Sequence, residues 1–331
     1  MDYNIKQPYG ATYNVNLQRE LPGQMTVTVG YAGSRAYNLV AAVEGNPNVP
    51  QIRADGSKFF PVVGVRRNPA FGPIDYRTSA ARSEYNSLQL SAQKRFSQRY
   101  SIQANYTLAK SMDNMQGQLG FDVNNSPIYP QDPYDREREW AASDFDVRHV
   151  STTNFVWDLP GDAANPLTGG WQFNGIVTLR SGVPFTPTLS GGGSGGWSRS
   201  GGANASDRPS LKPGVTPESL TRGDPNNYFD TSGFVIPEAG TFGNVERNSF
   251  RGPNYAMTSV SLVKNTRLGS AAQAQFRFEV FNVLNHANFA TPDHTVFAVV
   301  TGNEAPLATA GRINNTITTA RQLQMGVKLL F

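Results

Sequence analysis

A run of glycines at residues 191–196 is the first place where residue types and spacing suggest chemistry. Gly191, Gly193 and Gly196 fit the G-x-G-x-x-G pattern of a phosphate-binding loop. Gly192, Ser194 and Gly196 fit the G-x-S-x-G elbow that presents a serine nucleophile. The first pattern needs a strand before it and a helix after it, and the second needs a distant acid and histidine. The flanking residues are rich in Ser and Gly, so we expect a flexible surface loop here.

The densest cluster of charged side chains lies between residues 132 and 146. Carboxylate oxygens are the ligands that Ca²⁺ prefers, so a calcium site is one interpretation of this cluster. The spacing is not that of an EF-hand loop. We therefore expect a solvated, partly helical loop that contains Asp132, Asp135, Arg136, Glu137, Arg138, Glu139, Asp144 and Asp146.

The histidines and the absence of cysteine argue against a metal site and a disulfide framework. His149, His286 and His294 are isolated in the sequence, which predicts loop or strand-end positions and no metal site. Zero Cys excludes a disulfide framework and any Cys-ligated zinc or iron–sulfur site. No nucleophile–base pair or carboxylate pair has a supporting context. The sequence therefore predicts no catalytic residue, no cofactor and no enzymatic activity.

The overall charge gives equally little support for a nucleic-acid partner. Lys plus Arg is 29 and Asp plus Glu is 25, which gives a formal charge of +4, and no run of basic residues occurs. No apolar run approaches the ~18 residues of a membrane-spanning helix. The first residues, Met1–Asn4, lack the basic and apolar regions of a signal peptide.

Period-2 alternation of apolar and polar residues runs through most of the chain. Tyr100, Ile102, Ala104, Tyr106 and Leu108, for example, alternate with Ser101, Gln103, Asn105 and Thr107. Successive side chains of a strand point to opposite faces, so this segment has one apolar and one polar face. The same pattern recurs about nine times, which predicts an all-β fold.

The connections between these predicted strands are alternately short and long. Short links lie near residues 20–24, 97–99, 160–170 and 267–271, and long links near 33–83, 110–147, 182–253 and 284–318. Strict alternation places all the long loops at one end of an antiparallel meander. Thr216-Pro217-Glu218 predicts a short helix in the third long link, because Thr is a good N-cap and Pro is favoured at the first helical position.

Three features favour a membrane barrel over a soluble sandwich. The strands run about 10–13 residues, against ~5–6 in globular sheets and about 9–11 for strands that cross a bilayer. Their polar face carries Gln, Asn, Ser and Thr, and their loops are long at one end only, as in outer-membrane barrels. Aromatic side chains lie near strand ends, as in interfacial girdles, at Tyr31, Tyr100, Trp157, Trp171 and Phe331. Mean hydropathy is −0.42, as expected when half of each strand and all loops face water.

In such a barrel two charged side chains would face the lumen. Arg277 and Glu279 lie two residues apart on one predicted strand, so both point inward if Phe276 and Phe278 face lipid. We expect an ion pair between them, and a role in substrate passage is the alternative. The long loops are the expected place for ligand capture, especially residues 186–250, which contain Trp197, Tyr228, Phe229 and Phe234.

The chain ends in a strand that carries a family resemblance. Leu323, Met325, Val327, Leu329 and Phe331 alternate with polar residues up to an aromatic carboxy terminus, which resembles the signal that outer-membrane proteins present to the barrel-assembly machinery. The string from Phe276 to His286, followed by Asn288-Phe289, resembles a barrel strand of TonB-dependent receptors, especially the Oar-like group with a carboxypeptidase-regulatory-like domain. Further segments resemble the same barrel: residues 85–89, 94–96, 106–111, 144–149 and 180–185.

The resemblance implies energised transport through the outer membrane of a Gram-negative-type bacterium. Members carry an amino-terminal plug and a TonB-box segment, which contacts TonB and through it ExbB and ExbD. Neither is recognisable here, and an odd number of strands does not complete a barrel with both termini inside. We therefore expect residues 1–331 to be the C-terminal part, about nine strands, of a large barrel with long extracellular loops. TonB, ExbB and ExbD would act through the missing N-terminal part.

Two other functions remain open from the sequence. One is an outer-membrane barrel with a structural or adhesive role and no energised transport. The other is a soluble carbohydrate-binding β-sandwich, since a soluble sheet also has one apolar face.

Overall fold

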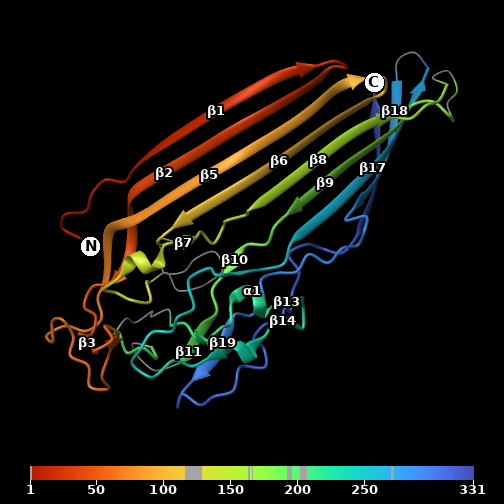
Figure 1. Ribbon diagram of the computed structural model, residues 1–331. Helices are drawn as coiled ribbons and strands as arrows, with labels where there is room; N and C mark the ends of the chain where they lie inside the picture. The colour runs from red at the N-terminus through yellow and green to blue at the C-terminus, as the bar shows by residue number, and fades with distance from the viewer. Residues whose placement is uncertain are drawn as a thin grey trace.

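A single large antiparallel sheet dominates the computed structural model (Figure 1). The structure describes residues 2–115, 129–162, 165, 167–191, 196–201, 207–269 and 272–331. Nine strands follow one another in chain order across the sheet, which confirms the predicted all-β meander. They are β1 (Tyr9–Leu21), β2 (Met25–Glu44), β5 (Asp75–Ser97), β6 (Tyr100–Asp113), β8 (His149–Asp158), β9 (Trp171–Arg180), β17 (Tyr255–Leu268), β18 (Ala272–Phe281) and β20 (Gln322–Leu330).

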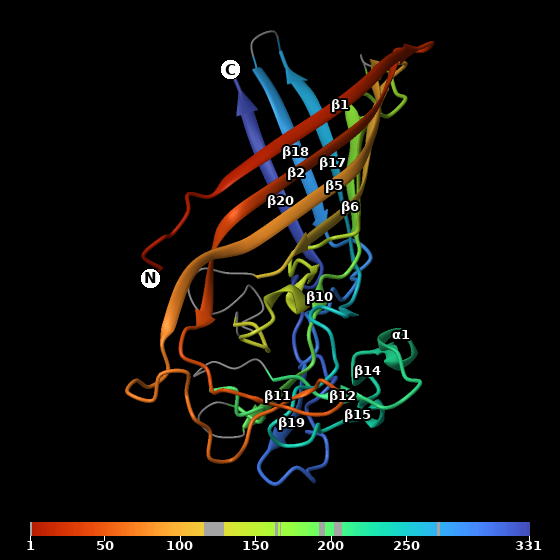
Figure 2. The same cartoon turned by 60° about the vertical axis from the view of Figure 1, so that its left-hand side comes forward.

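The sheet is curled, so β1 and β2 pass in front of β17, β18 and β20 when the molecule is turned (Figure 2). Among the described residues, β1 and β20 each pair with one neighbour only. The two-residue strand β7 (Ala141–Ala142) pairs with the loop end of β6. A sandwich would need two such sheets packed face to face, and the other described sheets have only two strands each.

The register brings apolar side chains together on one face across the whole sheet. Residues directly opposite each other in neighbouring strands lie on the same face. One such row crosses all nine strands through Leu21, Met25, Lys94, Ile102, Phe155, Gly175, Val260, Val280 and Leu323. On the other face polar side chains bond across strands, as where Ser91 Oγ donates to Asn105 Oδ1 at 2.8 Å. The sheet thus has the apolar and polar faces that the sequence predicted.

Aromatic side chains lie at two levels of the apolar face. Near the short turns Tyr100 stands opposite Trp157. Toward the other end Tyr9 stacks on Tyr37, and Tyr13 stacks on Tyr31. Amphipathic rings at two levels suit the two interfaces of a bilayer, with an apolar band between them.

The long connections lie at one end of the sheet and the short ones at the other (Figure 1). The first long link is shorter than predicted, because β2 continues to Glu44 and β5 begins at Asp75. The predicted boundaries 33–83 are therefore wrong. The register shifts between Ala36 and Ala41, where Asn38 takes φ 55°, and this bulge breaks the alternation that marks a strand in the sequence.

The four long links fold together into a compact body beyond the end of the sheet, here called the loop cap (described residues of 45–74, 129–148, 181–254 and 282–321). The cap contains short elements: β3 (Gln51–Ile52), β4 (Lys58–Phe59), η1 (Arg136–Glu139), β10 (Pro184–Phe185), β11 (Thr188–Gly191), β12 (Ser210–Leu211), α1 (Pro217–Leu220), β13 (Thr221–Asp224), β14 (Asn227–Phe229), η2 (Thr231–Gly233), β15 (Phe234–Val235), β16 (Phe250–Arg251) and β19 (Thr295–Val299). The predicted helix start is confirmed, since Thr216 caps α1 with a capping box and Pro217 follows it.

The loop cap has an aromatic core of its own. Phe185, Phe229, Phe234 and Phe250 are each at most 3% exposed, and in five of their six pairs the ring centroids lie 5.7–5.9 Å apart. Tilted and edge-on ring pairs at this spacing add about 0.5–1.5 kcal/mol each beyond the area that they bury. Across the described residues, no helix is long and apolar enough to cross a membrane.

Candidate binding site

The charged cluster at residues 132–146 is an internal part of the loop cap. Asp132, Glu139, Asp144 and Asp146 are each at most 3% exposed, so the prediction of a solvated loop is wrong for these four residues. Asp135, Glu137 and Arg138 are exposed, as predicted. Its helical part is confirmed as the single turn η1. Basic side chains lie beside these buried carboxylates: Lys58 of the first long link pairs with Asp132, and arginines from the link between β9 and β17 lie beside the other three.

Three arginines of the third long link lie beside Glu139, Asp144 and Asp146, and one of them also reaches Asp113 at the end of β6. Arg208 pairs with Glu139, Arg251 pairs with Asp146, and Arg247 Nη2 lies 2.5 Å from Asp113 Oδ1. A buried pair is strongly destabilised when one partner is removed, since the other charge then has no compensation. The arginines therefore fix the third long link onto the second. Within the described chain, no group of three or more acidic or histidine side chains could hold a metal ion.

Further contacts tie the first long link to the same body. Arg53 forms two hydrogen bonds with the Glu238 carboxylate, at 2.7 and 2.8 Å. Asn48 Nδ2 donates to the Arg199 carbonyl at 2.8 Å. The fourth link joins through a parallel pairing of β11 with β19. All four long links thus form one folded surface at this end of the sheet.

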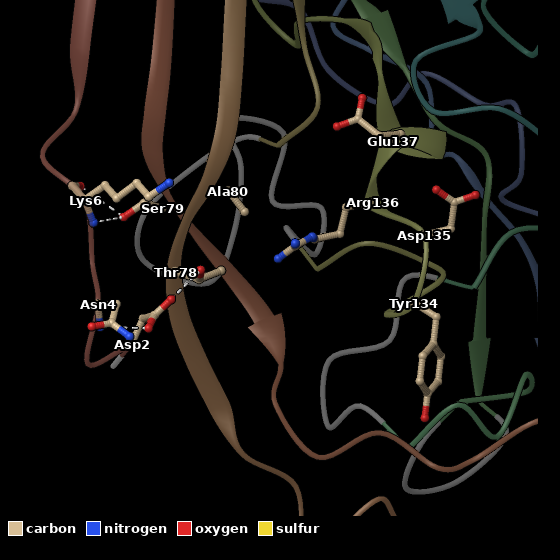
Figure 3. Close-up of a pocket in the computed structure, with 10 residues that line it drawn as sticks. All are labelled: Asp2, Asn4, Lys6, Thr78, Ser79, Ala80, Tyr134, Asp135, Arg136 and Glu137. Carbon is tan, nitrogen blue, oxygen red and sulfur yellow. Dashed lines mark hydrogen bonds between the residues drawn. The ribbon is translucent and has the colours of Figure 1, made fainter.

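A polar hollow of about 470 Å³ opens where this cap meets the amino-terminal segment (Figure 3). One wall is residues 2–6, which lie against β5: Lys6 N donates to Ser79 Oγ at 2.7 Å, and Thr78 Oγ1 donates to Asp2 Oδ2 at 3.0 Å. The opposite wall is Tyr134 to Glu137 at the start of η1. The Arg136 side chain extends from that wall toward β5 (Figure 3).

The hollow is lined by charges of both signs. No hydrogen bond or ion pair within the described chain occupies the Lys6 ammonium or the Arg136 guanidinium, whereas Glu137 pairs with Arg82 at 2.5 Å. The Asn4 backbone N–H, followed by the Thr78 hydroxyl, lowers the pKa of Asp2, so this carboxyl is ionised at neutral pH. Burial raises the pKa of Tyr134. The arrangement can bind a polar solute through two cations on opposite walls.

Sequence reasoning missed this hollow. It noted Asp135, Arg136 and Glu137 as part of a charged run, but nothing marked Asp2 or Lys6. The amino-terminal segment and η1 are far apart in the chain and meet only because the sheet brings β5 beside the second long link.

The predicted lumen residues lie on the polar face of the sheet. Arg277 stands opposite Val263, and Glu279 stands opposite Ser261. Arg277 Nε donates to Gln275 Oε1 at 2.7 Å. The ion pairs found among described residues do not include one between Arg277 and Glu279, and their pairing stays a prediction.

The carboxy-terminal signal residues form the last strand of the apolar face. Leu323, Met325, Val327 and Leu329 stand opposite Val280, Phe278, Phe276 and Ala274 of β18. Phe331 follows β20 and is 97% exposed. The residues are thus available to a partner, and their recognition by the assembly machinery stays a prediction.

The aromatic residues expected to capture ligand lie inside the loop cap. Tyr228, Phe229 and Phe234 are at most 7% exposed, and Trp197 packs against the same core. They stabilise the loops and present little surface to a ligand. His149 begins β8, His286 follows β18 and His294 precedes β19, as predicted. Residues 192–195 of the glycine run, and Ser270 of one predicted turn, lie outside the described residues.

Comparison with known proteins gives one family match and several distant solved structures. A family model described as an outer membrane beta barrel domain matches residues 1–324. No curated protein matches the chain. The outer membrane transporter YddB from Escherichia coli is 10% identical with a TM-score of 0.46, over 99% of this chain and 33% of that one.

Two further structures are similar at the same level. The FrpB iron transporter from Neisseria meningitidis is 12% identical with a TM-score of 0.43, over 99% of this chain and 32% of that chain. P. aeruginosa FpvA, in a structure with heterologous pyoverdines, is 10% identical with a TM-score of 0.43, over 97% of this chain and 27% of that chain. The chain therefore spans a third or less of the length of these proteins.

The family match covers almost the whole chain and agrees with the two-faced meander and its one-sided long loops. This protein belongs to the outer membrane β-barrel domain family and is located in the outer membrane.

Proposed function

We propose that residues 1–331 are one domain, the C-terminal part of the barrel of a TonB-dependent outer-membrane receptor of the Oar-like group. The observation that carries the proposal is the nine-stranded antiparallel meander whose long links all fold into one cap at one end. In outer-membrane barrels the long loops are extracellular and the short turns periplasmic. The loop cap then faces the medium, where it captures a large or scarce substrate.

The polar hollow between Lys6 and Arg136 is the proposed contact site for that substrate. It lies at the loop end of the sheet, and its cations have no described partner that a ligand would need to displace. The polar face of the sheet, with Arg277 and Glu279, would line the passage below it. Polar side chains inside a barrel are what a water-filled or plugged lumen requires.

The partners follow from the same proposal. Outer-membrane lipid contacts the apolar face, and the barrel-assembly machinery recognises Leu323, Met325, Val327, Leu329 and Phe331. TonB, ExbB and ExbD act through a plug segment outside residues 1–331. No catalytic step is assigned to the chain.

A non-energised structural or adhesive barrel is the second candidate. The observation that favours it is the buried aromatic core and the arginine pairs of the loop cap, which suit a fixed display surface. In energised transport the conformation of the loop cap depends on the proton-motive force. In a structural barrel it does not.

Cysteine labelling in cells separates the two functions. The chain has no cysteine, so Val63→Cys in the loop cap gives a single labelling site; Val63 is 85% exposed. The protein at its native length is expressed in the outer membrane of cells with TonB and of cells without it. In each kind of cell the rate of labelling by fluorescein maleimide is measured with and without a protonophore. Energised transport predicts a rate that changes with the protonophore only in cells that contain TonB. Equal rates in all four conditions would favour the structural barrel.

A further inference from the structure

We propose that the apolar face of β9, β17, β18 and β20 carries a phospholipid-binding site, with the headgroup phosphate at Lys264 and an acyl chain in the adjoining hollow. The proposal depends on the outer-membrane location alone. It holds whether or not the protein transports a substrate.

The acyl part of the site is a hollow of about 620 Å³ on this face. Apolar side chains form most of its walls: Leu262, Phe276, Phe278, Met325 and Val327, with Trp171 and Lys264 at one side. Gly326 and Arg277 also line it, and Arg277 belongs to the polar face of the sheet. Phe276 is 51% exposed, Met325 79% and Val327 66%, so no described segment covers them. An acyl chain is the occupant that the bilayer offers to an apolar hollow on this face.

The headgroup part of the site is Lys264, the cation that lies on the apolar face beside the hollow. Lys264 stands opposite Trp171 on one side and Phe276 on the other. Its side chain is largely buried, and the ion pairs of the described residues do not include it. A buried cation without an anionic partner is unfavourable, and a phosphate would compensate it.

Two contacts hold the Lys264 ammonium in place and leave some of its N–H donors free. Lys264 Nζ donates to the Gly169 carbonyl in the link between β8 and β9, and it lies 5.3 Å from the centroid of the Trp171 ring. An ammonium has three N–H donors, so two remain for phosphate oxygens. The carbonyl and the ring orient the charge without neutralising it.

A second lysine repeats the arrangement at the same end of the apolar face. Lys94 Nζ donates to Ser97 Oγ at 2.6 Å and lies 4.1 Å from the centroid of the Tyr100 ring. Both lysines extend their apolar stems along the sheet and place the charge at the short-turn end, as side chains do at a membrane interface. This end is therefore the level of lipid phosphates, and the hollow beside Lys264 adds a place for the chain.

Lipid titration by native mass spectrometry tests the proposal on the protein purified at its native length from outer membranes. The probe is dioleoylphosphatidylglycerol, and the readout is the dissociation constant of the one-lipid adduct. Lys264→Met keeps the stem and removes the charge, and we expect binding about tenfold weaker, equal to about 1.4 kcal/mol. Met325→Trp fills the hollow with an apolar side chain and is expected to weaken binding similarly. Lys328→Met is the matched control, because Lys328 lies on the polar face of β20 opposite Gln275.

Each outcome decides the proposal. Wild-type affinity in both Lys264→Met and Met325→Trp would overturn it, and equal binding of dioleoylglycerol, which lacks phosphate, would overturn the role of the headgroup. Competition by inorganic phosphate at the lipid's own concentration would show a free-anion site instead. Heat-modifiable migration on gels reports folding, and if Lys264→Met fails to fold, Met325→Trp and the dioleoylglycerol comparison decide.

Discussion

Arg247 in the loop cap reaches Asp113, the last residue of β6, across 134 residues of sequence, and its Nη2 lies 2.5 Å from the carboxylate. Its Nη1 lies 3.9 Å from Asp144 Oδ1. All three side chains are largely buried. One arginine thus joins the third long link to the second and to the end of the sheet.

Replacing Arg247 is predicted to open the loop cap without unfolding the sheet. Arg247→Met removes a positive charge from beside two buried carboxylates, and we expect the free energy of cap opening to fall by about 3–5 kcal/mol. Hydrogen exchange at the backbone amides of residues 207–254 measures this free energy of opening. Arg53→Met is the control, since the Arg53–Glu238 pair is exposed and contributes at most about 1 kcal/mol. Equal exchange in the two variants would contradict the role given to Arg247.

Glu304 is predicted to hold the turn at residues 300–302 in a pH-dependent manner. Its carboxylate accepts bonds from the Thr301 N–H and hydroxyl and from the Gly302 N–H, which lower its pKa to about 2. A lowered pKa means that the stabilisation is complete above about pH 4.5, the ordinary value, and is lost as pH falls toward 2. We expect Glu304→Gln to speed amide exchange at Thr301 and Gly302 near neutral pH. Unchanged exchange at these two amides would show that the carboxylate does not hold the turn.

The two faces of the sheet are predicted to differ in reactivity to thiol reagents. Val15 on β1 lies on the apolar face opposite Tyr31, and Asn16 lies on the polar face opposite Gly30. Because the chain has no cysteine, Val15→Cys and Asn16→Cys each give a single site. In outer membranes a charged maleimide should label Asn16→Cys and spare Val15→Cys. The reverse pattern would mean that the faces have been assigned the wrong way round.

Deleting Phe331 is predicted to impair assembly. Phe331 is almost fully exposed beyond β20, so its loss removes no internal contact and acts through a partner, the barrel-assembly machinery. We expect a strongly reduced level of the protein in the outer membrane, measured by immunoblot of membrane fractions. Leu268→Ala, an exposed apolar residue at the end of β17, is the control. Normal levels of the deletion variant would rule out the assembly signal.

The strands of the sheet could be predicted from the sequence wherever apolar and polar residues alternate regularly. In β6 and β8, for example, Ile102 and Phe155 share a face in the structure as they do in the pattern. Beyond Asn38 the pattern failed, because a bulge shifts the register and the next residues include Ala41 and Ala42 side by side. Both alanines are buried, so this part of β2 has lost the two-faced character that identifies a strand.

The loop cap could not be predicted from the sequence for a different reason. Phe185, Phe229 and Phe250 form one core, but they come from separate short segments without a common period. Gly- and Pro-rich links look the same in sequence whether they are solvated or packed. The buried state of Asp144 and Asp146 depends on arginines about a hundred residues away, which only the folded sheet brings near.

The long sequence separations across the loop cap determine when it forms. Arg53 and Glu238 are 185 residues apart, and Asn48 and Arg199 are 151 apart. Closing such large loops costs entropy before any contact is made, and non-local pairings form slowly. Four of the eight neighbouring strand pairs, β1–β2, β5–β6, β8–β9 and β17–β18, instead meet across short turns, and such hairpins close in microseconds. We therefore expect the contacts between the long links to form after the four short-turn hairpins, and until they form the long links are open to proteases.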